Sequence, residues 1–277
     1  MNAGMKAFCI LICALLLLAG CKNKEKSSLD SSFASTESGG SYASESSSVY
    51  NSVSEQATEA IEKAAQAITP SEEAVEMMNE RRRIETDATL RDCVATVNDC
   101  HIYEWELELA MHSNRVTVEN GRKQIEQAQM PEEDKQRVLQ DYQLMDEDEI
   151  LNQLIRSQVI KQMAEKEGIT VTDEEALQAA KDAIDQVKQM LISENVSERE
   201  QAEQIYGEMK AAYTSYGITE EAYLQDYAGP SYKTMMISQR LHDAFVSGLS
   251  ESEKPNAESL YQAYIDESVE DAKVVIY

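Results

Sequence analysis

Few side chains in this chain of 277 residues could take part in covalent chemistry, and the thiol of Cys21 is the clearest of them. It ends the segment Leu-Ala-Gly-Cys, directly after an apolar run over residues 7–19 that follows Lys6. A helix that crosses a bilayer needs roughly 20 apolar residues, so this run is too short to span one. A positive residue, a short apolar run and small residues before a cleavage site are the layout of a secretory signal.

The four residues that end in Cys21 resemble a bacterial lipobox, in which the cysteine takes a diacylglyceryl group and becomes the first residue after cleavage. On this interpretation residues 1–20 are a lipoprotein signal peptide, cut between Gly20 and Cys21. Two acyl chains attach a protein stably to a membrane, whereas one chain binds only marginally. We therefore expect an extracytoplasmic protein of the bacterial cell envelope, held at the membrane through its N-terminal lipid only. The alternatives are an ordinary secretory signal that happens to end at a cysteine, or a signal anchor.

The charge balance excludes one class of partner. Cleavage would remove one of the 25 basic residues and no acid, which leaves 24 basic and 51 acidic residues and a formal charge of −27. Nucleic-acid binding needs clustered lysine and arginine, so no nucleic-acid partner is expected. The acids are spread along amphipathic segments, where their first effect is solubility. The one basic cluster, at residues 81–83, lies among acids in a helical stretch and is interpreted as a solvated face.

Two of the five cysteines, Cys93 and Cys100, lie beyond the predicted signal and its acceptor cysteine. A disulfide is chemically permitted in an exported protein. However, a two-residue turn at 98–99 would place Cys100 opposite Val97 and offset it from Cys93. Two free, buried thiols are therefore expected, with a disulfide as the alternative. The three histidines show no metal-ligand spacing with these cysteines, so neither a metal site nor a cofactor is predicted.

The remaining chain divides by composition into three parts. Residues 21–54 are rich in serine and cannot bury enough apolar area to offset their ordering entropy, which predicts a disordered tether. About 32 such residues have an r.m.s. reach of roughly 30 Å. Residues 55–90 have a helical pattern broken at Thr69-Pro70, and form either a stalk or an arm packed on the main domain. Residues 91–277 are enough for a single well-buried domain.

We predict a mainly α fold with one short β-hairpin and a possible C-terminal strand. The segments 93–97 and 100–102 favour strands on either side of a turn at 98–99, and 273–277 is strand-like. Helical periodicity, capping residues and prolines predict the remaining elements. These are helices from about 105 to just before Gly121, over 131–139, 149–167, 173–190, 197–213 and 219–245 with a break at Gly229-Pro230, and a last one that opens at Pro255, with the helical pattern continuing to about Ala272.

Two of these helix starts carry a capping box, Thr172 with Glu175 and Ser197 with Glu200, in which the side chains of both residues bond the opposite backbone N–H. Gly168 is expected to end the helix before the first of them in a left-handed conformation.

Three segments of the domain carry a family pattern: 94–107 (VATVNDCHIYEWEL), 154–175, which ends in GITVTDEE, and 217–224 (GITEEAYL) with 260–264 later. Together they resemble the SurA/PrsA group of extracytoplasmic chaperones. The first is similar to that group's opening hairpin and first helix, the second to its central helix and following turn, and the third to its returning helices. The resemblance runs from about residue 91 to the end of the sequence, and the second segment is the most specific. It implies a SurA N-terminal-like multi-helix domain that binds unfolded or newly secreted polypeptides.

The sequence departs from that group at three places. Asp99 stands where the group has glycine, and Tyr103 replaces the hydroxyl residue that caps the first helix, so a weaker cap is expected. Relatives that isomerise prolyl bonds carry a parvulin module after a strand similar to 272–277, and no such module follows here. The resemblance therefore implies no isomerase activity, and we expect a protein that is not an enzyme. No glycine-rich phosphate loop, G-x-S-x-G or H-E-x-x-H motif suggests other catalysis.

Tyrosine and methionine suit a surface that must accept many sequences, because tyrosine gives contact area with few rotors and methionine is flexible and polarizable. The residues predicted to bind polypeptide are Tyr213, Tyr216, Tyr223, Met235 and Met236. The alternative is that these side chains fill the seams between helices.

The function predicted from the sequence is that of a lipid-anchored extracytoplasmic chaperone, foldase-like but without its own isomerase module. One alternative is a scaffold lipoprotein that binds a single envelope partner. The other is a peptidyl-prolyl cis-trans isomerase truncated before its catalytic module.

Overall fold

A computed structural model describes residues 47–128, 130–140 and 142–277. The predicted signal peptide, the lipidation site at Cys21 and most of the predicted tether lie outside the described residues.

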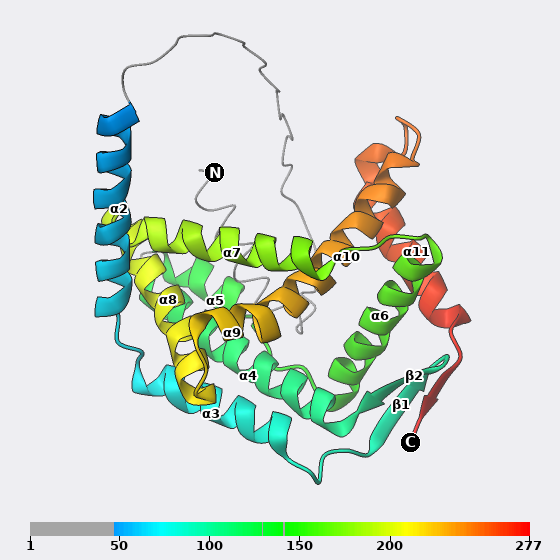
Figure 1. Ribbon diagram of the computed structural model, residues 1–277. Helices are drawn as coiled ribbons and strands as arrows, with labels where there is room; N and C mark the ends of the chain where they lie inside the picture. The colour runs from blue at the N-terminus through cyan, green and yellow to red at the C-terminus, as the bar shows by residue number, and fades with distance from the viewer. Residues whose placement is uncertain (1–46, 129, 141) are drawn as a thin grey trace.

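The described chain is mainly helical with a small antiparallel sheet, as the sequence predicts (Figure 1). The helices are α2 (Ser47–Ala67), α3 (Glu72–Thr86), α4 (Glu104–Gln127), α5 (Glu132–Leu139), α6 (Glu147–Lys166), α7 (Asp173–Met190), α8 (Val196–Tyr216), α9 (Glu220–Tyr223), α10 (Gly229–Ser247) and α11 (Ala257–Asp271). A π-helical turn, η1 (Leu224–Ala228), joins α9 to α10, and a 3₁₀ turn, η2 (Lys254–Asn256), precedes α11. The strands are β1 (Cys93–Val97), β2 (Cys100–Tyr103) and β3 (Val274–Ile276).

The sheet is built around β1, with β2 on one edge and β3 on the other. The predicted turn forms, with Asn98 at φ +54° and Val97 paired with Cys100. Asn98 also fixes the C-terminal strand, because its N–H donates to the Lys273 carbonyl at 2.8 Å and its Oδ1 accepts from the Lys273 N–H at 3.0 Å. The hairpin and the C-terminal strand are therefore one sheet.

Two large hydrophobic clusters are buried on opposite sides of the molecule. The first joins β1, β2, α4, α6 and α11, with Ile150 and Ile265 almost fully buried. The second joins the end of α2 to α7, α8 and η1. Helix α10 belongs to both, because Leu241 lies in the first cluster, Tyr232 in the second, and Ile237 packs against each. In Figure 1, α10 accordingly runs diagonally from the α7–α8 side to the α6–α11 side.

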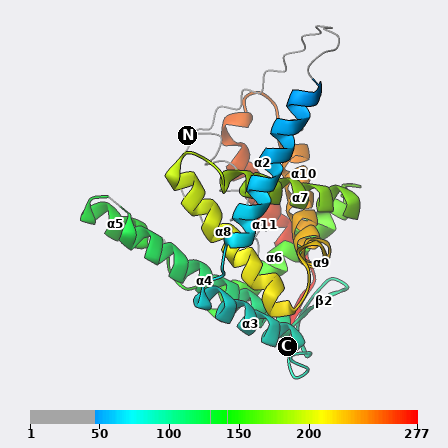
Figure 2. The same cartoon turned by 60° about the vertical axis from the view of Figure 1, so that its left-hand side comes forward.

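A second connection between the two sides runs through α3 and α4. Ala74 and Met78 of α3 pack on Ala211 and Ala212 of α8, and α3 also lies against α4, which in turn contacts α6. The far end of α4 and the short helix α5 project away from the body, as Figure 2 shows. The buried apolar residues are thus divided into separate clusters instead of one continuous core.

The segment 55–90 packs on the domain in the way expected of an arm. Ala65 is buried with residues of α7 and α8. The ammonium of Lys210 donates to the carbonyls of Ala65, Gln66 and Ile68 at 3.2, 3.0 and 2.7 Å. These carbonyls lie at the C-terminal end of α2, where backbone acceptors lack helical partners and a cation is favourable.

Short-range sequence signals predicted several helix boundaries correctly. The Thr172–Glu175 capping box forms, with Thr172 Oγ1 accepting from Glu175 N at 3.1 Å and Glu175 Oε2 accepting from Thr172 N at 2.9 Å. Gly168 ends α6 at φ +70°, as expected. At the start of α4, Tyr103 makes no side-chain cap, but the Glu106 carboxylate accepts from the Tyr103 N–H at 2.9 Å.

Three predicted helix boundaries were wrong, namely the end of α4, the start of α8 and the break before α10. Helix α4 continues through Gly121 to Gln127, and the glycine is explained by the ring of Tyr142, which lies where a Cβ at 121 would be. Helix α8 begins at Val196 and is capped by Asn195, a residue type as effective as serine, so Ser197 lies within its first turn.

The break expected at Gly229-Pro230 is instead the π turn η1, which leads directly into α10. Proline has no N–H to donate and its ring crowds the carbonyl four residues earlier, and a wider turn accommodates both.

Candidate functional site

The three tyrosines predicted to bind polypeptide lie together where α8 meets α9 and η1. Tyr213 packs edge-on against Tyr223 with ring centroids 6.4 Å apart, Tyr223 stacks on Tyr227 at 5.8 Å, and Tyr216 lies 4.7 Å from Tyr227. All four rings are half-buried. The Tyr216 hydroxyl donates to Glu85 of α3 at 2.5 Å, and burial is the main cause that raises the pKa of Tyr216. These rings fill the seam between α8, α9 and α3, which matches the alternative given for them.

The two predicted methionines occupy a similar position. Met235 and Met236 lie on α10, are partly buried, and pack against the cluster formed by α7 and α8. Tyr213 and Tyr223 pack against the same cluster, so the fold does bring these four side chains to one side of the molecule. None of the five predicted residues lines either of the two larger hollows described next.

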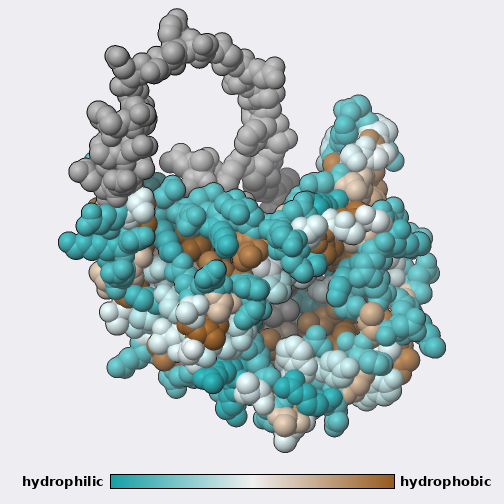
Figure 3. Space-filling view, viewed as in Figure 1, coloured by the Kyte–Doolittle hydropathy of each residue, from teal (hydrophilic) through white to brown (hydrophobic). Residues whose placement is uncertain are grey.

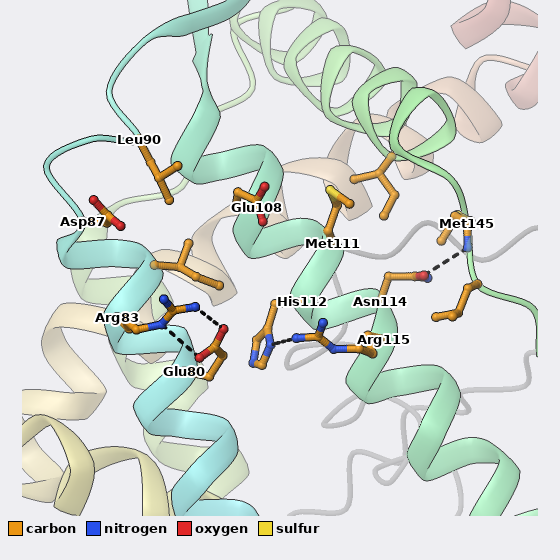
Figure 4. A pocket seen from close by; sticks show the side chains of 13 residues that line it. Glu80, Arg83, Asp87, Leu90, Glu108, Met111, His112, Asn114, Arg115 and Met145 are labelled. Carbon is orange, nitrogen blue, oxygen red and sulfur yellow. Dashed lines mark hydrogen bonds and ion pairs between the residues drawn. The ribbon is translucent and has the colours of Figure 1, made fainter.

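A hollow of about 420 Å³ opens between α3, α4 and the segment that leads into α6; we call it the α3–α4 hollow (Figure 4). Its apolar side chains are Ile84, Leu90, Met111, Leu144, Met145 and Ile150, and its polar ones are Glu80, Arg83, Asp87, Glu108, His112, Asn114 and Arg115. A wider hollow of about 870 Å³ shares Glu80, Arg83, His112 and Arg115 and continues along the seam toward Lys123 and α8. Together they form a groove with an apolar part and charges of both signs.

One wall of the groove is an ion pair within α3. Arg83 donates to Glu80 through Nε at 3.1 Å and Nη2 at 2.6 Å, a two-pronged contact that lowers the pKa of the Glu80 carboxyl. Because the Arg83 side chain is largely exposed, this pair shapes the rim more than it stabilises the fold.

The opposite wall carries His112, only 7 % exposed. Arg115 Nη2 lies 3.0 Å from His112 Nδ1, and since arginine can only donate, Nδ1 accepts and the ring is neutral. Burial, and next the charge of Arg115, lower the pKa of His112, while a hydrogen bond to the backbone of Met77 acts in the opposite direction. The neutral imidazole therefore fixes the guanidinium beside the groove, as Figure 4 shows.

Asn114 ties α4 to the segment before α6. The residue is 3 % exposed, and its side-chain Oδ1 accepts from the Met145 N–H at 3.1 Å. This bond holds Met145 and the neighbouring Leu144, which is 58 % exposed, at the edge of the hollow.

The predictions for the two remaining cysteines and for metal binding can be compared with the described part of the chain. Cys93 and Cys100 are unpaired, as expected, though each is partly exposed and not fully buried. Residues 47–128, 130–140 and 142–277 contain no group of three or more side chains arranged to hold a metal ion. Over the same residues, no helix is long and apolar enough to cross a membrane.

Sequence reasoning missed the α3–α4 hollow, since its residues come from three separate segments. One signal was present: Glu108, Met111, His112 and Arg115 recur at helical spacing on a single face of α4. A mixed stripe of this kind differs from the purely apolar stripe of a core-facing helix.

Comparison with protein-family models, with curated proteins and with solved structures found no match to this chain. The resemblance to the SurA/PrsA group thus rests on the sequence segments alone and stays a prediction.

Replacing His112 with glutamine should reduce the loss of stability on acidification. Histidine in an unfolded chain titrates near pH 6.5, and the folded pKa is lower, so below about pH 6.5 the unfolded state binds more protons. The free energy of unfolding should then fall more steeply for the wild type than for H112Q between pH 7.5 and 5.5. Denaturant titrations at both pH values measure the difference.

The difference between the wild type and H112Q reports the titration of His112, because its charged neighbours are the same in both proteins. These neighbours are Glu80 and Arg81 of α3 and Arg115 of α4. Glu106 and Glu208, whose pKa values are raised by burial, contribute a slope of opposite sign, but both proteins contain them. Equal pH slopes for the wild type and H112Q would show that His112 does not carry this linkage.

Proposed function

We propose that this protein is a lipid-anchored extracytoplasmic chaperone that holds unfolded or newly exported polypeptides. The observation that carries the proposal is the α3–α4 hollow, an open groove whose apolar side chains include two methionines and whose rim has charges of both signs. The mainly helical fold with a hairpin is the fold class that the SurA/PrsA resemblance implies.

Several physical features of the groove suit loosely specified ligands. Met111 and Met145 can adjust to side chains of different shape. The exposed Leu144 offers apolar area to an incoming chain. In the space-filling view, hydrophilic side chains cover most of the visible face, and hydrophobic ones are exposed in several separate patches (Figure 3). A surface of this kind favours binding of apolar segments without nonspecific association over the whole face.

The N-terminal sequence supplies the proposed location. A diacylglyceryl group on Cys21 would attach the protein to the membrane, and residues 21–54 would act as a tether with a reach of roughly 30 Å. The large negative charge, −26 for the whole chain, would keep captured complexes soluble through mutual repulsion.

The two alternative functions suggested by the sequence can be distinguished from the proposed one by experiment. A truncated or hidden isomerase would accelerate cis-trans exchange of a proline peptide, which the holding proposal does not expect. A scaffold lipoprotein would capture one stoichiometric partner, whereas a holding chaperone captures several unrelated denatured proteins.

The double variant M111Q/L144S should lose most of the ability to suppress aggregation. Both changes remove apolar surface from the α3–α4 hollow, where a client segment is proposed to bind. We expect at least a threefold higher protein-to-client ratio for half-maximal protection of a chemically denatured enzyme, followed by light scattering.

The matched control is I192S/V196S, which removes two exposed apolar side chains, 42 % and 53 % exposed, outside that hollow. It should protect clients as the wild type does. Equal protection by M111Q/L144S and the control, at equal thermal stability, would contradict the proposed binding surface.

Replacing Cys21 with alanine should release the protein from the membrane, because no thiol remains to carry the acyl chains. Membrane and soluble fractions are compared by immunoblotting, and mass spectrometry of the wild type reports the acylated N-terminal cysteine. A Cys93→Ala variant, changed at a thiol inside the folded domain, should stay with the membrane. The lipid anchor is refuted if the wild type and C21A distribute equally between the membrane and soluble fractions and the N-terminus of the wild type carries no acyl group.

A further inference from the structure

Arg115 differs from the other charged residues around the groove. It is exposed on α4 and lines both hollows. Within the described residues its guanidinium contacts His112, through one Nη2 donor, and forms no ion pair with any carboxylate. A guanidinium has five N–H donors. In a protein with 51 acidic residues, an arginine held beside a groove by a neutral histidine has most of its donors available to a ligand.

Asn114 supplies a second, independent observation. The residue is 3 % exposed and lines the same hollow, and its Oδ1 is used by the Met145 N–H. Since that partner is a donor, the orientation of the amide is fixed, and the side-chain NH₂ has no acceptor among the described residues. The only fully buried side-chain polar atom without a partner among the described residues is the Tyr232 hydroxyl, so water reaches this NH₂, and an acceptor oxygen that enters the hollow can take the place of that water.

The apolar side chains define what must accompany that oxygen. Met111, Leu144 and Met145 line the same hollow of about 420 Å³. A ligand that satisfies both parts therefore presents an acceptor anion directly beside an aliphatic side chain. The C-terminal residue of a polypeptide does this, because its α-carboxylate and its side chain share one Cα.

We propose that the α3–α4 hollow binds the free C-terminal carboxylate of a polypeptide that ends in an aliphatic residue. Arg115 and the Asn114 amide donate to the carboxylate, and Met111, Leu144 and Met145 contact the last side chain. The acids Glu80, Asp87 and Glu108 in the same lining repel any anion, and they repel a doubly charged phosphate more strongly than a singly charged carboxylate. The inference rests on the proposed function, since it names the part of the client polypeptide that is recognised.

Binding of short fluorescent peptides to the full chain in a mild detergent tests this. One hexapeptide ends in Ala-Leu with a free carboxylate, a second has the same sequence with an amidated end, and a third is amidated and carries one internal glutamate. Fluorescence anisotropy should give at least a tenfold lower Kd for the free acid than for either amide, as expected for loss of a charge-assisted, two-pronged contact.

Variants of Arg115 test the assignment. R115Q should reduce the preference for the free acid to below about twofold, and R115K, which keeps the charge but lacks the planar fork, should give an intermediate value. The matched control R137Q removes an arginine of the same charge on α5, 76 % exposed and away from both hollows, and should keep the full preference.

Equal affinity for the acid and amide peptides overturns the inference, and so does an internal glutamate that binds as tightly as the free end. This wild-type comparison decides the matter even if R115Q does not fold. If all three peptides bind equally and denatured clients are protected, the holding function stands and C-terminal recognition fails. If no peptide binds and no client is protected, both fail.

Discussion

The arrangement of this protein depends on the sharing of α10 between two separate hydrophobic clusters. Ile237 packs against both, while Leu241 is buried in one and Tyr232 in the other. Since α10 must satisfy both clusters, it holds the α7–α8 side at a fixed separation from the α6–α11 side. The second connection, through α3 and α4, closes the arrangement without merging the clusters into one core. The α3–α4 hollow lies along this second connection, and Met111, Met145 and Ile150 from the edge of the first cluster form part of its lining.

Polar side chains in that seam are compatible with the fold because most of them are paired. His112 bonds Arg115, Asn114 accepts from Met145, and Glu80 is held by Arg83. Buried polar groups are costly unless they are hydrogen-bonded, so the bonds of His112 and Asn114 make their burial tolerable, whereas the Glu80–Arg83 pair lies at the exposed rim. The same pairing leaves the groove with positioned donors, and it makes stability depend on the protonation of His112.

Local structure was readable from the sequence where a signal acts within a few residues. The turn at Asn98, the Thr172–Glu175 box and the left-handed Gly168 each depend on short-range geometry and were predicted correctly. Gly121 was misinterpreted because its role is set by Tyr142, a tertiary neighbour that the sequence does not place beside it.

The site was harder to predict for the same physical reason. Tyrosine is a suitable residue type for binding, but only the tertiary contacts reveal that Tyr213 packs on Tyr223 and that Tyr216 bonds Glu85. The α3–α4 hollow joins residues that are far apart in the sequence, so no local window contains it. Helical spacing identifies which residues of α4 share the face that lines the hollow. The residues that lie opposite this face are known only from the folded structure.

The central claim is that unfolded chains are gripped in the α3–α4 hollow, and site-specific photo-crosslinking in living cells tests it most directly. A photoreactive amino acid at position 144, at the edge of the hollow, should form crosslinks to several different exported proteins, increasing when export is blocked late. The same probe at position 192, exposed but outside the hollow, should form few. A single crosslinked partner at 144, or equal crosslinking from both positions, would contradict the account.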